Sequence, residues 1–205
     1  NPTINALVED RFDVAMKEAI DADQLITSRT EDLPPFHGVP CTIKECFALE
    51  GMPQSSGLLS RKSIRVQDDA PTVSNLRKAG FIPMGVTNLS ELCMWMESNN
   101  KVYGRSNNPY DPERTVGGSS GGEGAIVGAG GSPLGLGSDI GGSIRMPAFF
   151  NGVFGHKPSP GIISNKGQYP IAENEALNYL CTGPICRRAE DLPALSKVLA
   201  GEKAD

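Results

Sequence analysis

Apolar residues recur at intervals of three or four positions in several segments of the chain, a spacing typical of helices with one buried face. The longest such segment covers residues 3–26, and residues 70–79 and 189–200 repeat the pattern over a shorter length. Residues 90–96 and 144–150 are shorter stretches of the same kind. The pattern therefore predicts five helices.

Three short runs of apolar and β-branched residues, 38–44, 81–86 and 134–138, predict strands between these helices. Helices that alternate with short apolar strands favour an α/β fold whose β-sheet is covered by helices on both faces. The chain has 205 residues, no internal repeat and no long linker, so we expect residues 1–205 to form a single domain.

The composition narrows the classes of function. Apolar residues make up 39% of the chain and charged residues 21%, as in ordinary globular proteins. The net charge of −5 and the lack of a Lys/Arg cluster argue against nucleic acid as a partner, because binding to phosphates needs clustered positive charge. The five cysteines, an odd number without CxxC spacing, favour reduced thiols in an intracellular compartment over a zinc site, and no metal or cofactor is expected.

The 24 glycines are the unusual feature, since glycine normally makes up about 7% of a protein. Among the Gly-Gly-Ser sequences of the glycine-rich region, two end in Ser119 and Ser143. Successive N–H groups in a glycine turn before a helix can stabilise an oxyanion, so Ser143, which precedes the predicted helix at 144–150, is a candidate nucleophile. Neither GxxxxGK[ST] nor GxGxxG after a strand occurs, which argues against a nucleotide site.

A serine nucleophile needs a base, and the chain has only two histidines, His37 and His156. A buried lysine is the main alternative base, and Lys44, near the end of a predicted strand, is the best placed candidate. The position of Lys44 in a strand also fits another role, in which a lysine prevents an edge strand from pairing with other chains. This protective role is the commoner one for lysines in strands.

A second hydrolase hypothesis comes from Gly117-Gly118-Ser119-Ser120-Gly121, which satisfies the G-x-S-x-G motif of α/β-hydrolases. Ser119, Asp139 and His156 follow in the order of that triad. The interval between them is too short for that fold, so this stays a minor alternative.

Residues 117–159, GGSSGGEGAIVGAGGSPLGLGSDIGGSIRMPAFFNGVFGHKPS, resemble the signature of the amidase signature family of serine hydrolases. The flanking segments GVPCTIKE (38–45) and GVTNLSE (85–91) are similar to the lysine motif of that family and to the segment before its substrate pocket. Within the family, the resemblance is greatest to the fatty-acid amide hydrolase 2 group, in residues 95–111 (WMESNNKVYGRSNNPYD) and 181–184 (CTGP). The resemblance covers nearly the whole chain.

This resemblance implies a Ser-Ser-Lys triad, with Ser143 as acyl-enzyme nucleophile, Lys44 as base and Ser119 as the bridging serine, in a cis conformation. Ser119 and Ser120 compete for the bridging role, and the interval of 24 residues between the two serines in the family selects Ser119. The resemblance also implies that the N–H groups of residues 140–143, which are Ile140, Gly141, Gly142 and Ser143, form the oxyanion hole.

For the substrate, Leu92-Cys93-Met94-Trp95-Met96 is similar to a segment that lines the acyl pocket in lipid amidases, so Met94 and Trp95 are candidate substrate-binding residues. A helix packed in the core is an equally good interpretation of this segment. The resemblance implies hydrolysis of fatty-acid amides through an acyl-enzyme. The alternatives are a glutaminase of the amidotransferase type, which passes ammonia to an aminoacyl-tRNA partner, and a catalytically silent fragment or binding module.

Members of the family are longer than this chain. We therefore expect the N-terminal and central part of one amidase domain with a mixed sheet, the C-terminal half and any N-terminal membrane-binding segment lying outside these residues. The expected partner is a small lipid amide, membrane association would depend on the segment outside, and a homodimer is left open.

Overall fold

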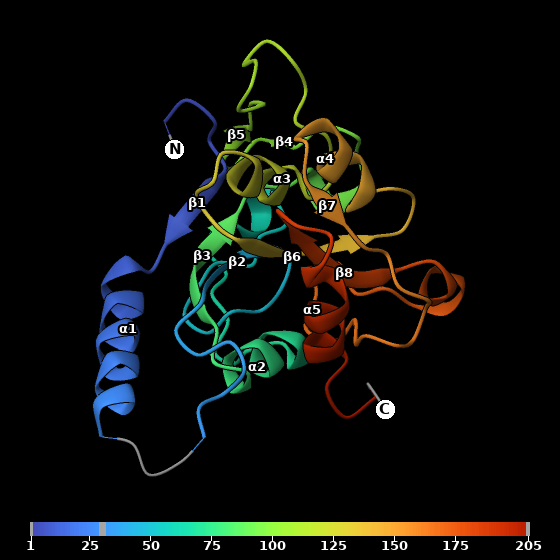
Figure 1. Ribbon diagram of the computed structural model, residues 1–205. Helices are drawn as coiled ribbons and strands as arrows, with labels where there is room; N and C mark the ends of the chain where they lie inside the picture. Colours follow the sequence, from blue (N-terminus) through green and yellow to red (C-terminus); the bar gives the residue numbers. More distant parts are fainter. Residues whose placement is uncertain (1, 29–31, 204–205) are drawn as a thin grey trace.

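Six strands form one mixed sheet in the computed structural model, which describes residues 2–28 and 32–203 (Figure 1). Their order across the sheet is β1-β3-β2-β6-β8-β7. Strands β3, β2 and β6 run parallel in the middle, and β1, β8 and β7 pair antiparallel at the two sides. The strands of this sheet are β1 Leu7–Asp10, β2 Pro40–Lys44, β3 Ile82–Thr87, β6 Leu134–Asp139, β7 Phe154–Gly155 and β8 Cys181–Cys186. A separate ribbon pairs β4 Asn99–Asn100 with β5 Gly104–Arg105.

Helices cover both faces of the sheet, as the sequence predicts. Helices α2 and α5 pack together on one face, and α3 and α4 pack together on the other (Figure 1). Helix α1 packs beside β3. The helices are α1 Phe12–Thr27, α2 Pro71–Lys78, α3 Gly121–Gly128, α4 Arg145–Phe150 and α5 Asp191–Ala200. Within the described residues, no helix combines the length and apolar composition needed to cross a bilayer.

Strand β2 has a different chemistry on each of its two faces. Cys41 and Ile43 belong to the main apolar core, which also includes residues of α2 and α5. Thr42 and Lys44 point the opposite way, since successive side chains of a strand alternate, and Thr42 contacts Glu123 of α3. The alternation therefore places polar groups under α3 while the core fills the other face.

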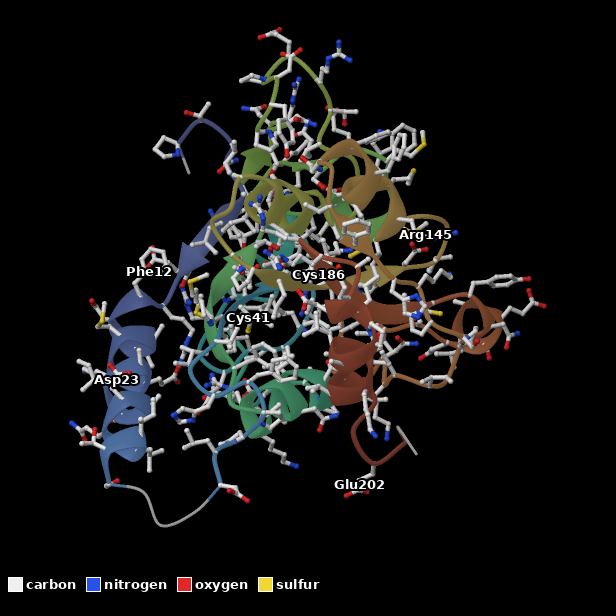
Figure 2. All side chains as sticks on the ribbon, in the orientation of Figure 1. Phe12, Asp23, Cys41, Arg145, Cys186 and Glu202 are labelled. Atoms are coloured by element: carbon white, nitrogen blue, oxygen red, sulfur yellow. The ribbon has the colours of Figure 1, made fainter. Side chains whose placement is uncertain are left out.

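The helix predicted over residues 3–26 is wrong at its N-terminal end. Residues 7–10 form β1, whose main chain pairs with β3, and α1 begins only at Phe12. Pairing with a neighbouring strand satisfies the main-chain groups of these residues, which helical periodicity cannot reveal. The apolar face of α1 is not fully covered, because Phe12 and Ile20 are about half exposed. Figure 2 shows the Phe12 side chain at the start of this helix.

Two of the longer elements are absent from the sequence prediction. Helix α3 contains four glycines, which disfavour helices, yet a Cβ at Gly122 would lie 2.4 Å from Asn88 N and one at Gly124 would lie 2.7 Å from Asn151 Nδ2. Close packing therefore requires glycine at these positions. Strand β8 contains Pro184, which disfavours a strand between two others, but it pairs with both β6 and β7.

The helix predicted over residues 90–96 is also wrong. The structure has only a 3-10 turn at Glu91–Cys93, in which Leu92 and Cys93 have φ angles of 53° and 59°. The Ser90 hydroxyl is hydrogen bonded to the carbonyls of Trp95 and Glu97. Such local hydrogen bonds from a serine side chain to the main chain compete with helix formation. The segment forms an irregular loop instead.

Candidate active site

Polar side chains gather where the three parallel strands end. Lys44 ends β2, Thr87 ends β3 and Asp139 ends β6. The carboxyl ends of adjacent parallel strands lie at one edge of a sheet, which is the usual place for a site in α/β proteins. The topology therefore brings together groups from three distant parts of the chain.

Lys44 is fully buried, and its amine makes two contacts with serines. Its Nζ lies 2.7 Å from Ser119 Oγ and 3.0 Å from Ser138 Oγ. In the described part of the chain, no carboxylate lies within ion-pair distance of this amine. Because β2 lies between β3 and β6, the alternative that Lys44 protects an edge strand is wrong.

Ser119 lies just before α3 and is fully buried. The peptide bond between Gly118 and Ser119 is cis. The neighbouring Ser120 hydroxyl donates instead to the carbonyl of Ser138, 3.3 Å away. Of these two adjacent serines, Ser119 is thus the one whose hydroxyl meets Lys44. His156, the base of the α/β-hydrolase alternative, is exposed and does not line the cavity described below.

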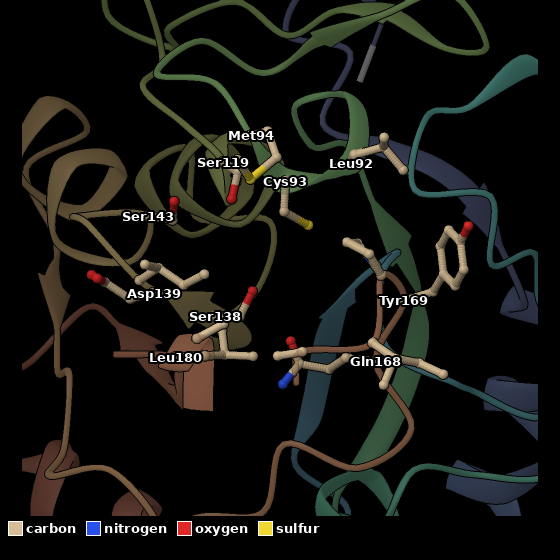
Figure 3. Close-up of a pocket in the computed structure, with 15 residues that line it drawn as sticks. Leu92, Cys93, Met94, Ser119, Ser138, Asp139, Ser143, Gln168, Tyr169 and Leu180 are labelled. Carbon is tan, nitrogen blue, oxygen red and sulfur yellow. The ribbon is translucent and has the colours of Figure 1, made fainter. Parts of the chain in front are cut away.

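Ser143 lines the same cavity as Ser119, and Figure 3 shows the two hydroxyls near each other at one end of it. It follows Gly142, whose φ of +125° is accessible mainly to glycine, and precedes α4. The Ser120 N–H donates to the Ser143 carbonyl at 3.1 Å. This bond directly joins the segments that carry Ser119 and Ser143.

The carboxylate of Asp139 organises the turn that carries Ser143. It accepts from the N–H groups of Gly142 at 2.7 Å and Ile144 at 3.1 Å, and the Arg145 guanidinium donates to it at 2.9 and 3.0 Å. Although burial opposes ionisation, these hydrogen bonds hold the pKa of Asp139 well below its usual range. The carboxylate therefore stays charged.

The same turn determines which of the predicted oxyanion N–H groups are available. Gly142 already donates to Asp139. Among the described residues, the N–H groups of Ile140, Gly141 and Ser143 have no acceptor. Ile140 and Ser143 line the cavity itself. These three N–H groups stay candidates for the oxyanion site, whereas the Gly142 N–H is already hydrogen bonded to Asp139.

Glu123 of α3 is a buried acid on the Lys44 side of the sheet. Its two carboxyl oxygens are hydrogen bonded to Thr42 Oγ1 at 2.6 Å and to Thr87 Oγ1 at 2.8 Å. Burial raises the pKa of Glu123 to about 8, although the two threonines and the nearby Lys44 act against this rise. At neutral pH this carboxyl is therefore largely protonated, and it places little negative charge near Lys44.

The cavity that holds these serines is largely apolar and has a volume of about 660 Å³, open solvent at its mouth included (Figure 3). Its apolar lining comes mainly from two segments, 92–94 and 169–180. Met94 lines it, whereas Trp95 does not. Both side chains are about 70% exposed, so the alternative of a helix packed in the core is wrong.

Sequence reasoning missed several residues of this site. Ser138 contacts the Lys44 amine and Glu123 lies in the adjoining polar layer. Cys93 lines the cavity, and hydrogen bonding with Cys46 lowers its pKa. The position of Ser138 near the end of β6, next to β2, is a signal that could have indicated it.

Comparisons with known proteins identify the family of this chain. The family model described as Amidase matches residues 1–205. The chain is 58% identical to fatty-acid amide hydrolase 2-A of Danio rerio, with 100% of this chain and 40% of that protein covered. It is 58% identical to fatty-acid amide hydrolase 2 of Homo sapiens, covering 98% of this chain and 39% of that protein.

The fold also matches a solved amidase. The native peptide amidase of Stenotrophomonas maltophilia superimposes with a TM-score of 0.88 at 32% identity, covering 97% of this chain and 40% of that one. The chain thus spans about 40% of the length of these relatives. The matched segment contains the sheet, the glycine clusters and the cavity. This chain therefore belongs to the amidase family.

Proposed function

We propose that this chain supplies the catalytic part of a serine amidase that hydrolyses fatty-acid amides through a Ser-Ser-Lys triad and an acyl-enzyme. The observation that carries the proposal is the buried contact of 2.7 Å between Lys44 Nζ and Ser119 Oγ, beside the cavity that Ser143 lines. A buried amine without a carboxylate partner can act as a base when it is neutral.

In the first half of the reaction, the Ser143 oxygen attacks the amide carbon and passes its proton to Ser119. Ser119 gives its own proton to the neutral amine of Lys44, which can keep an N–H bond to Ser138 at 3.0 Å. The amide oxygen becomes an oxyanion, which the free N–H groups of Ile140, Gly141 and Ser143 would stabilise.

In the second half, the tetrahedral intermediate collapses and the bond to nitrogen breaks. The proton returns from Lys44 through Ser119 to the departing nitrogen, because an unprotonated amine leaves poorly. Water then attacks the acyl-enzyme with the same groups as base, which releases a carboxylic acid and restores Ser143. Every proton taken up in one step is returned in a later one.

The choice of substrate rests on the cavity and on the names of the relatives. Its lining by Leu92, Met94, Ile140, Ile171 and Leu180 suits an apolar acyl chain. Two relatives at 58% identity are called fatty-acid amide hydrolases. We infer a small lipid amide as the substrate.

The test is labelling with a fluorophosphonate probe followed by mapping of the modified residue. We expect Ser143 to be labelled, Ser143→Ala to abolish labelling, and Lys44→Ala to slow it at neutral pH by roughly 10⁴- to 10⁶-fold. Lys78→Ala, at an exposed lysine of α2, is the matched control. Labelling that persists in Ser143→Ala would refute the nucleophile.

Measurement of ammonia release from two amides distinguishes the candidate functions. Release of ammonia from oleamide, but not from glutamine, is expected for a fatty-acid amidase. The reverse result would favour the glutaminase alternative. A chain that unfolds cooperatively and takes no probe would favour the silent fragment.

A further inference from the structure

Lys157 lies behind the turn that carries the candidate oxyanion N–H groups. It follows β7, its side chain is only 18% exposed, and it does not line the cavity. Its Nζ donates to the carbonyls of Asp139 at 2.9 Å and Ile140 at 2.8 Å, and also to the carbonyl of Tyr179. The ammonium group thus binds two consecutive peptide carbonyls of this turn.

The direction of these carbonyls determines where the N–H groups point. In a trans peptide, C=O and N–H point in opposite directions. The peptide with the Asp139 carbonyl carries the Ile140 N–H, the peptide with the Ile140 carbonyl carries the Gly141 N–H, and neither peptide bond is cis. When both carbonyls face Lys157, both N–H groups must face away from it.

Strand pairing ends within this turn. Pairing between β6 and β8 ends at Asp139 and Cys181, so the peptide between Ile140 and Gly141 lies beyond the sheet. The Asp139 carboxylate holds the far side of the turn through Gly142 and Ile144. Lys157 contacts the carbonyls of the two peptides in between.

We propose that Lys157 is a positioning residue of the oxyanion site: it binds the carbonyls of Asp139 and Ile140 so that the N–H groups of Ile140 and Gly141 face the substrate oxygen. The same contacts polarise the two peptides and make their N–H groups stronger donors. This inference rests on the proposed amidase function and assigns no proton transfer to Lys157. Its contact with the Tyr179 carbonyl also ties the turn to the cavity wall at Leu180.

The test compares Lys157→Met, which keeps the length of the side chain but removes its donors, with Lys157→Arg and with Lys166→Met at an exposed lysine. Thermal unfolding establishes that each variant is folded. We expect kcat of Lys157→Met to fall by about 10²- to 10³-fold with little change in KM, as after loss of an oxyanion donor. Lys157→Arg should lose less, because it keeps the charge but binds the carbonyls with a different geometry.

A second measurement reports the oxyanion directly. A trifluoromethyl ketone with a ¹³C-labelled carbonyl adds to the nucleophile, and the ¹³C shift of the adduct follows the ionisation of its hemiketal oxygen. This ionisation should move to higher pH in Lys157→Met, and to a smaller extent in Lys157→Arg, while Lys166→Met matches the wild type. If Lys157→Met does not fold, the shift in Lys157→Arg decides the question.

The outcomes separate the inference from the proposed function. Folded Lys157 variants with unchanged kcat and an unchanged hemiketal titration would overturn the positioning role while leaving the amidase intact. A wild-type chain that neither reacts with the fluorophosphonate nor forms the adduct would refute the proposed function itself.

Discussion

The buried carboxyl of Glu123 gives the sharpest test of how this sheet and its polar layer are built. It lies between Thr42 and Thr87, and a Cβ at Gly135 would lie 1.8 Å from its Oε2. The substitution Glu123→Gln keeps the volume and both hydrogen bonds but removes the ionisation. The amide can donate to one threonine and accept from the other, as the protonated acid does.

The magnitude follows from linkage between protonation and folding. The carboxyl has an ordinary pKa of 4.5, and burial raises the pKa to about 8 in the folded chain. Between these values the folded chain binds more protons than the unfolded chain, so the free energy of unfolding falls as the pH rises. Each pH unit costs about 1.4 kcal/mol, which amounts to about 3 kcal/mol at pH 7 and at most about 5 kcal/mol above pH 8.

The assay is urea unfolding of the wild type and of Glu123→Gln at pH values from 4 to 9. The stability of the variant relative to the wild type should increase by about 3 kcal/mol between pH 4 and pH 7 and then level off above pH 8. Comparison of this difference between pH values cancels the contribution of every other titrating group. Glu173→Gln, at an exposed carboxyl, is the matched control for the loss of one acidic group. A difference that is constant with pH would refute the reasoning.

Two further predictions concern the turn and the sheet. Asp139→Asn should lower the free energy of unfolding by about 2 kcal/mol at pH 7, because the charged hydrogen bonds to Arg145 are lost. The pKa of Asp139 is depressed by folding, so the wild type loses this stability as the pH falls below 3.8, and urea unfolding should show the difference narrowing there. Gly135→Ala should cost about 1–3 kcal/mol in thermal unfolding, because its Cβ would meet Glu123, which Thr42 and Thr87 hold in place. An unchanged melting temperature would contradict this account of the packing.

The elements that sequence reasoning found are those whose local pattern agrees with their environment. Strand β2 and helix α5 carry apolar residues at the period of their own structure, and both bury them in the same core. Helix α3 and strand β8 contradict their local propensities, since glycine disfavours the helix and Pro184 disfavours the strand. Contacts with neighbouring segments decide these elements, and a local pattern cannot report them.

The candidate site shows the same division. Residue types and the resemblance to a family nominate Lys44, Ser119 and Ser143, and the structure places Lys44 against Ser119 across 75 positions of sequence. Met94 lines the cavity, while Trp95 is not part of the lining. Ser138 and Lys157 were not nominated, because the contact of Ser138 with Lys44 and those of Lys157 with main-chain carbonyls form only in the folded chain.

The sequence by itself determined which candidate reactive residues this protein has: two serines beside glycine turns, few histidines and a lysine in an apolar strand. Those features are local, so composition and spacing are sufficient to read them. Only the tertiary structure decided which groups meet, because the parallel order of β3, β2 and β6 brings three strand ends to one edge. Burial then decided the charge states: it raises the pKa of Glu123, while hydrogen bonds to the Asp139 carboxylate keep that group ionised despite burial. These effects depend on the distance between groups in the folded chain, and the sequence does not contain that distance.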